Sequence, residues 1–314
     1  MERVILLNDE ELIKKYVEDC ELRNYVPMTI RRYRNDVKFL SRFLRKKGKT
    51  LIEATKEDFK DFIRYMKNER KCKYTRIERI FSSFSSFYDF LEESGLIVKS
   101  PIPSIRKRYL RRYKDNNHGE RKLISIEEMA RFINSIGDIR DKAIALLLAK
   151  TGIRKGELIS IDLDDINWND MSIILKPKAK RSNRIVFFDE EAAYILRKWI
   201  RMRSSIAAKD EKALFVSYKT GKRLRDNGVE RAFRYWAARI GLHNPYSDRI
   251  EDHFTPHNCR HWFTTWLMRN GMPREYVKEL RGDARREAID IYYHIDREEL
   301  KKSYLACIPK LGVG

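Results

Sequence analysis

The sequence is poor in the residues that cross-link small folds or bind metals. Its 314 residues include four cysteines, which are widely scattered along the chain. No CxxC pair and no Cys/His spacing typical of metal ligands occurs, so neither a zinc site nor a disulfide scaffold is indicated. We therefore expect reduced thiols in or near hydrophobic cores at Cys20, Cys72, Cys259 and Cys307.

Long apolar segments are also lacking. No run of about eighteen apolar residues occurs, and the first residues, MERVILLNDEE, are charged and do not match a cleavable signal. A GxxxxGKS/T phosphate-binding loop is absent as well. We expect a cytoplasmic protein that uses neither a metal nor a nucleotide cofactor. Its hydrophobic content of 42% is enough for ordinary cores.

Positive charge, in contrast, is abundant. Lysine and arginine number 67 against 46 acidic residues, which gives a formal net charge of +21. Such a charge favours a polyanionic partner, and nucleic acid is the commonest one. An anionic membrane surface is the rival partner.

The length is sufficient for two domains, and the first is predicted to be helical. Residues 9–95 carry apolar side chains at helical spacing, and four helices of this length can form a small bundle. We interpret their aromatic side chains as core and assign residues 1–98 to this domain. The predicted helices are Asp9–Leu22, Met28–Lys47, Thr55–Lys67 and Thr75–Ser94.

Residues 99–122 are predicted to be a basic linker. They contain nine basic residues and two acidic ones, and Pro101 and Pro103 disfavour a helix before Ser104. A flexible tether is one interpretation, but the charge density favours a segment that follows a phosphate backbone.

Residues 123–314 form the second predicted domain, mainly α-helical with a small antiparallel sheet. Two short strands, Met171–Leu175 and Arg184–Phe188, flank a basic hairpin tip. There is no alternating βα pattern and no internal repeat. The carboxylates near Asp162 are interpreted as a turn, not a metal site. The predicted helices include Arg140–Lys150, Glu190–Arg203, Asn227–Ile240, Thr255–Gly271, Pro273–Arg281 and Ala284–Tyr293.

Candidate functional residues recur through this second domain. His257 and Arg260 are three apart on one predicted helix, so their side chains are neighbours suited to holding a phosphate. A basic surface face with an ordinary histidine is the alternative. The segment TGIRKGEL places Arg154 after a glycine break at a helix start, where backbone donors also favour an anion. Further along the chain, Asp283 follows Gly282.

The order and the residue types of these segments resemble the motifs of the tyrosine recombinase family, also called phage integrases or Xer-type recombinases. The family combines T-G-x-R-x-x-E-L, a hairpin lysine, H-x-x-R and a terminal Y-x-H, and the match here spans Thr151 to His294. The segment LRGDARREAIDIYYHI is most similar to forms carried by archaea and their mobile elements. The resemblance implies the catalytic residues Arg154, Lys180, His257, Arg260, Asp283 and Tyr292.

Two positions depart from the family pattern. Asp283 replaces the usual His or Trp, nine residues before Tyr292. Because a carboxylate cannot donate to a phosphate unless protonated, we hypothesise that Asp283 orients Arg260 or His257, or caps the last helix. The hairpin lysine does not align cleanly; we favour Lys180, with Lys178 as the alternative.

The nucleophile has a rival next to it. Neighbouring helical residues point about 100° apart, so only one of Tyr292 and Tyr293 can face the phosphate. The spacing to His294 and Asp283 favours Tyr292.

The resemblance implies a C-shaped clamp around double-stranded DNA, built from a SAM-like core-binding bundle and a catalytic domain. It also implies site-specific recombination at paired inverted sites through a 3′-phosphotyrosine and a Holliday junction. The alternatives are a nicking-closing enzyme like type IB topoisomerases and a non-catalytic DNA-binding protein. The apolar stripe within Glu298–Val313 either packs on its own domain or, as the family implies, docks into a neighbour in a homotetramer formed on DNA by otherwise monomeric chains.

Overall fold

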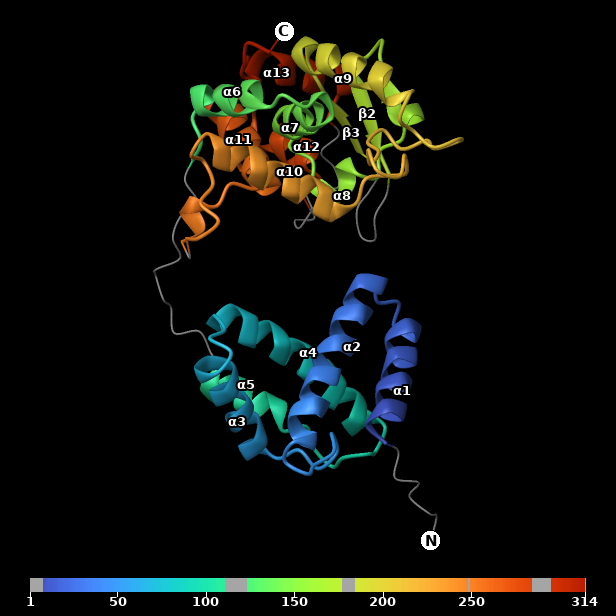
Figure 1. The fold of residues 1–314 in the computed structure, drawn as a ribbon, viewed down its shortest axis with the longest axis vertical. Helices are drawn as coiled ribbons and strands as arrows, with labels where there is room; N and C mark the ends of the chain where they lie inside the picture. Colours follow the sequence, from blue (N-terminus) through green and yellow to red (C-terminus); the bar gives the residue numbers. More distant parts are fainter. Residues whose placement is uncertain (1–7, 111–122, 177–183, 248, 284–294, 314) are drawn as a thin grey trace. The chain divides into compact units, whose positions relative to one another are not determined.

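The computed structural model describes residues 8–110, 123–176, 184–247, 249–283 and 295–313. The chain divides into two compact units, Met1–Asn116 and Asn117–Gly314 (Figure 1). None of the described helices is long and apolar enough to cross a membrane.

The N-terminal unit is a helical bundle with an aromatic core, as predicted. Asn8 and Thr55 form capping boxes that fix the starts of the first and third helices. The predicted aromatic stripe is buried: Phe81, Phe84 and Tyr88 are at most 1% exposed. The helices are α1 (Asp9–Leu22), α2 (Pro27–Arg45), α3 (Lys56–Asn68), α4 (Tyr74–Glu93) and α5 (Ile102–Tyr109).

Helix α5 corrects the predicted linker. The helix begins at Ile102, so the expectation that the two prolines disfavour a helical start before Ser104 in this segment is wrong. Pro103 lies in the first turn, where its missing N–H removes no intrahelical hydrogen bond. Ile102 and Ile105 are buried in the core of the N-terminal unit, which therefore extends beyond residue 98.

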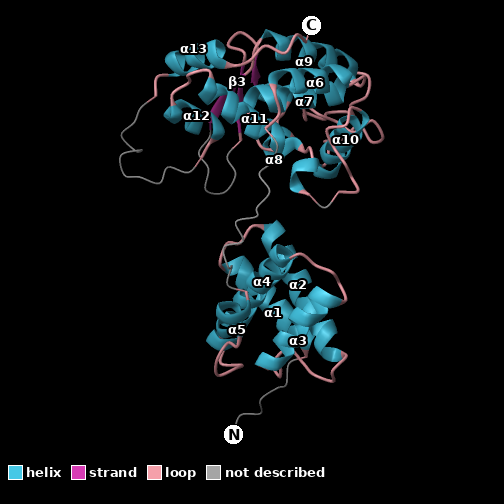
Figure 2. Cartoon of the chain, turned by 90° about the vertical axis from the view of Figure 1, so that its left-hand side faces the viewer, coloured by secondary structure: helices cyan, strands magenta, loops and turns pink. Residues whose placement is uncertain are grey.

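The C-terminal unit is mainly helical (Figure 2), and its most buried helix is α7. Helix α7 is buried almost throughout, and α9 and α11 both pack against it. The α-helices are α6 (Ile126–Ser135), α7 (Ile139–Thr151), α8 (Lys155–Leu158), α9 (Glu190–Arg203), α10 (Asp226–Arg239), α11 (Pro256–Arg269), α12 (Arg274–Arg281) and α13 (Arg297–Cys307). The short turns η1 (Leu163–Asp165) and η2 (Ile250–Asp252) are 3₁₀ helices.

A small antiparallel sheet lies beside these helices, as predicted. Its order is β1 (Ile166–Asn167), β2 (Ser172–Leu175) and β3 (Arg184–Phe187). Strand β1 is not predicted from the sequence and is only two residues long. Leu175 pairs with Arg184 at the start of the hairpin tip.

The apolar stripe near the C-terminus packs on its own unit. Tyr304 is fully buried and Leu300, Ile308 and Leu311 are nearly so, whereas Leu305 is 38% exposed. Of the two interpretations left open by the sequence, packing on the same domain is the one present in this structure.

Candidate active site

Arg154 and Arg260 come together around one backbone carbonyl. Arg154 Nη1 donates to the carbonyl oxygen of Arg281 at 3.2 Å, and Arg260 Nη2 donates to the same oxygen at 2.9 Å. Two guanidinium groups from distant parts of the sequence, one preceding α8 and one on α11, therefore lie side by side.

The glycine of the TGIR segment makes this meeting possible. Gly152 ends α7 in the left-handed conformation (φ +60°), and a Cβ there would lie 2.3 Å from the ring of Phe263 on α11. Only glycine combines that conformation with so close an approach. Arg260 Nη1 also donates to the Gly152 carbonyl at 2.8 Å, so the segment leading to Arg154 is tied directly to α11.

Asp283 lies against both arginines. Its Oδ1 is 3.1 Å from Arg260 Nη2 and 3.7 Å from Arg154 Nη2, and its Oδ2 is 3.2 Å from Arg281 Nε. This placement fits the hypothesis that Asp283 orients Arg260. The predicted helix that Asp283 would cap instead, Ala284–Tyr293, lies outside the described residues. Its part in a reaction stays a prediction.

Burial, followed by the charges of Arg154 and Arg281, lowers the pKa of Arg260 to about 9. Asp283 acts in the opposite direction. The Arg260 guanidinium is thus held in a poorly solvated place beside two other cations. An anion bound between Arg154 and Arg260 would relieve this repulsion, so the arrangement suits a phosphate.

Two residues that are not predicted as site residues from the sequence support this cluster. Glu157 and Arg184 form a buried two-pronged ion pair, with Nη1–Oε1 and Nη2–Oε2 both 2.9 Å. Burial alone would raise the pKa of Glu157, but hydrogen bonds from Arg184 and from the backbone N–H of Arg154 hold it at about 2. Glu157 lies within the TGIRKGEL segment, so a motif marks it in the sequence. For Arg184, the sequence offers only its position as the first residue of a predicted strand.

His257 occupies the first turn of α11. Its side chain is exposed, and its ring lies against that of His261 with the centroids 4.8 Å apart. Arg260, one turn later, points into the unit and is buried. The remaining predicted site residues, Lys178, Lys180, Tyr292 and the rival Tyr293, lie outside the described residues.

The acidic cluster near Asp162 is neutralised by basic side chains. Asp162 pairs with Lys176 and Arg223, and Asp165 closes a capping box with Asp162 at η1. Within the described ranges, no group of three or more His, Cys, Asp or Glu side chains is placed to hold a metal.

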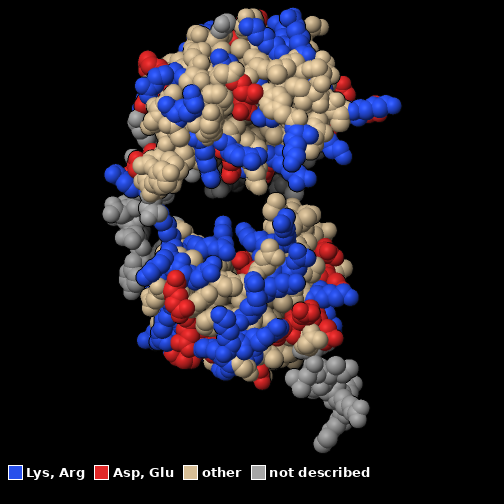
Figure 3. Space-filling model, in the orientation of Figure 1, with Lys and Arg blue, Asp and Glu red and all other residues tan. Residues whose placement is uncertain are grey.

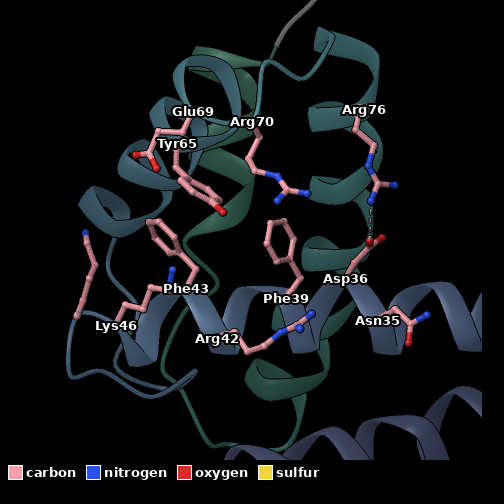
Figure 4. Close-up of a pocket in the computed structure, with 11 residues that line it drawn as sticks. Asn35, Asp36, Phe39, Arg42, Phe43, Lys46, Tyr65, Glu69, Arg70 and Arg76 are labelled. Carbon is pink, nitrogen blue, oxygen red and sulfur yellow. Dashed lines mark ion pairs between the residues drawn. The ribbon is translucent and has the colours of Figure 1, made fainter.

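The N-terminal unit carries a separate basic groove of about 610 Å³. Lysine and arginine side chains gather on the face of this unit seen in Figure 3. In Figure 4, Arg42 and Arg70 extend toward the ring of Phe39, and Arg76 reaches the buried Asp36. The groove is lined from α2, α3 and α4 and the turns after α2 and α3 by Asn35, Asp36, Phe39, Arg42, Phe43, Lys46, Lys47, Tyr65, Glu69, Arg70 and Arg76.

Comparisons with known proteins agree on one family. The model of the phage integrase family matches residues 123–299, and that of the phage integrase N-terminal SAM-like domain matches residues 12–95. Tyrosine recombinase XerC of Leptospira interrogans is 25% identical over 305 residues, covering 95% of this chain and 93% of the relative. XerC of Vibrio cholerae serotype O1 is 29% identical over 242 residues, covering 76% and 73%.

Solved structures show the same fold. A lambda integrase dimer bound to a COC′ core site matches with a TM-score of 0.68 at 16% identity, over 93% of this chain and 78% of that one. The Tn1549 transposon integrase in complex with circular intermediate DNA matches with a TM-score of 0.67 at 18% identity, over 94% and 98%. These relatives are bacterial or from mobile elements, and the archaeal likeness stays a prediction.

Proposed function

The chain belongs to the phage integrase family and is a tyrosine-type site-specific DNA recombinase, and from this premise we propose how it cleaves and rejoins DNA. The observation that carries the proposal is the meeting of Arg154 and Arg260 at the Arg281 carbonyl. A scissile phosphodiester between these guanidinium groups would have its non-bridging oxygens neutralised, together with the charge added in the pentacoordinate transition state.

The proposed nucleophile is Tyr292. Its hydroxyl oxygen attacks phosphorus and its proton passes to His257, which also donates to the phosphate when protonated. The bond from phosphorus to the 5′ oxygen breaks, and that oxygen takes a proton from the hairpin lysine, Lys180 or Lys178. The product is a 3′-phosphotyrosine that keeps the energy of the phosphodiester bond. Rejoining by a 5′ hydroxyl of the partner strand therefore uses no ATP and leads to a Holliday junction.

The proposed partner is double-stranded DNA with paired inverted sites. The net charge of +21 and the groove of the N-terminal unit support this partner. The cations of the groove suit phosphate oxygens. Two of them lie over aromatic rings of the same groove, Lys47 over Phe43 and Arg70 over Phe39.

We further propose a homotetramer on DNA. If the C-terminal segment is exchanged between protomers, α13 must first leave its own unit, where Tyr304 is fully buried. The buried site vacated on each chain would then take the same segment of a neighbour.

Covalent capture tests this function. A pool of nicked suicide duplexes with a randomised core is incubated with the chain, and protein–DNA adducts that survive denaturation are isolated. Wild type and Tyr293→Phe should form adducts, whereas Tyr292→Phe should bind DNA without forming them. Wild-type binding without any adduct would contradict catalysis. Relaxation of a one-site plasmid without strand exchange between two sites would favour a topoisomerase-like enzyme.

A further inference from the structure

A buried ion pair, Glu157–Arg184, lies next to Arg154 in the proposed phosphate site. Neither residue has a proposed contact with DNA. Arg184 is the first residue of β3 and Glu157 lies in α8; both side chains are 4% exposed. Burying a charged pair is costly, and apolar residues of similar volume are often as stable. Stability alone is therefore a weak reason for this pair, and its geometry suggests another.

Glu157 is bonded to Arg154 itself, whereas Arg184 is bonded to the residue before Arg281. Glu157 Oε2 accepts the backbone N–H of Arg154 at 2.7 Å, and Oε1 lies 3.4 Å from Arg154 Nη1. Arg184 Nε donates to the carbonyl of Leu280 at 3.0 Å. The next carbonyl along the chain, that of Arg281, is the one that accepts from both Arg154 and Arg260. The pair thus links the Arg154 segment to the end of α12.

The turn that carries Asp283 is packed directly on the same guanidinium group. Gly282 has φ +61°, and a Cβ at this position would lie 2.6 Å from Arg184 Nη1 and 2.7 Å from its Cζ. The Arg184 guanidinium therefore packs against the turn at Gly282 and also makes two hydrogen bonds to the Glu157 carboxylate. A lysine has one nitrogen and cannot make the paired bonds to Glu157 together with the bond to Leu280.

We propose that Arg184 is a positioning residue, which sets the place of Arg154 relative to the turn formed by Arg281, Gly282 and Asp283. It does not touch the substrate. Its effect is to keep Arg154 and Arg260 at a spacing that matches the two non-bridging oxygens of one phosphate. This inference rests on the proposed function and adds a residue that no motif of the sequence marks.

The test compares Arg184→Lys with wild type on two substrates. One is a duplex captured covalently by the wild-type chain; the other has a methylphosphonate at the cleaved position, which carries no negative charge. If Arg184 acts by placing the two arginines, Arg184→Lys should slow cleavage of the phosphodiester by roughly 10–100-fold. The loss on the methylphosphonate should be only about threefold or less, because that substrate needs less charge stabilisation. Non-covalent DNA affinity should stay within about twofold.

Arg203→Lys is the matched control. Arg203 is also buried, but its guanidinium bonds the carbonyls of Ala213 and Glu211, whereas that of Arg184 bonds Glu157 and the Leu280 carbonyl. Any slowing in this variant should be equal on both substrates. Glu157→Gln keeps the size of the other partner and should reproduce the selective loss of Arg184→Lys, which covers the case in which that variant does not fold.

Equal losses on the two substrates in both Arg184→Lys and Glu157→Gln, or no loss in either, would overturn the positioning role. In that case wild-type cleavage would leave the proposed function standing. Failure of the wild-type chain to form any adduct would overturn the proposed function, and the positioning role with it.

Discussion

Arg154, Arg260 and Arg281 share the carboxylate of Asp283. This balance of charge leaves room for one more anion, and the loss of one arginine should be felt most in the transition state. Arg260→Ala is expected to slow covalent capture of DNA by ~10²–10³-fold, with a much smaller effect on DNA affinity. Single-turnover kinetics at saturating DNA measure the first quantity and a filter-binding titration the second.

Arg269→Ala is the matched control for Arg260. Arg269 lies on the same helix but is exposed and stacks on Trp266. Its removal should leave capture within about twofold, as for an ordinary surface substitution. If both variants are equally slow, Arg260 has no special part in the chemistry.

Glu157 gives a prediction about pH. Its pKa falls from 4.5 to about 2 in the folded chain, so it contributes stability above pH 4.5 that is lost as the pH falls toward 2. Glu157→Gln should therefore lower the free energy of unfolding by roughly 3 kcal/mol at pH 7 and by little near pH 2. Urea unfolding at several pH values measures the difference, and a deficit that does not change with pH would contradict the ion pair.

At the scale of single residues, the sequence predicts that Arg154 and Arg260 belong to the site, but it does not predict the groups that hold their side chains in position. Arg154 and Arg260 are marked by local motifs, because each sits beside a helix signal that can be read without the rest of the chain. The positions of the Arg281 carbonyl and of the Arg184–Glu157 pair depend on how α8, β3 and α12 pack. Residue spacing within one segment cannot predict that packing.

Among the elements, the basic groove gives the sharpest prediction about DNA. Arg70→Ala should weaken binding to duplex DNA about equally for different sequences and reduce the salt dependence by about one phosphate contact. Lys56→Ala is the control, because Lys56 is exposed at the other end of α3. Unchanged salt dependence in Arg70→Ala would remove the groove from the DNA contact surface.

The end of α7 is tied to the C-terminal segment by a buried lysine. Lys150 Nζ bonds Asp189 at 2.6 Å, Glu191 at 2.5 Å and the carbonyl of Pro309 at 2.7 Å, while Tyr304 donates to the Lys150 carbonyl at 2.9 Å. Replacing Lys150 with an uncharged residue would leave the carboxylates of Asp189 and Glu191 without the cation that they share.

Lys150→Met is accordingly expected to lower the free energy of unfolding by about 3–5 kcal/mol. The partly exposed Lys142 on the same helix provides the comparison, and Lys142→Met should change that energy by less than about 0.5 kcal/mol. Urea denaturation measures both, and similar small losses would show that the lysine does not hold the segment.

Element prediction from sequence succeeds where apolar spacing is long and regular. The helices of the bundle, α7 and α11 are of this kind. It fails for α5, because Pro103, which is expected from the sequence to disfavour a helix, lies in the first turn, where proline is tolerated. It also fails for β1, because a strand of two residues is too short to show an alternating apolar pattern. The docking of α13 on its own unit is open in the sequence, since the same apolar stripe fits either chain.

For the molecule as a whole, charge and chemistry lead to the same partner. A chain with a net charge of +21 attracts a polyanion, and the relatives of this chain are named tyrosine recombinases. The two units are each compact, and the family models match both of them. Composition alone indicates nucleic acid; the assignment to recombination needs the spaced motifs of the second unit.

In the proposed reaction, Arg154 and Arg260 hold the phosphate that Tyr292 attacks. Identification of the DNA-linked residue tests this most directly: the captured adduct is digested with nuclease and protease, and the modified peptide is sequenced by mass spectrometry. We predict a nucleotide remnant on Tyr292. A remnant on Tyr293 or on any serine, or an adduct whose yield is unchanged when both arginines are replaced by alanine, would contradict the proposed reaction.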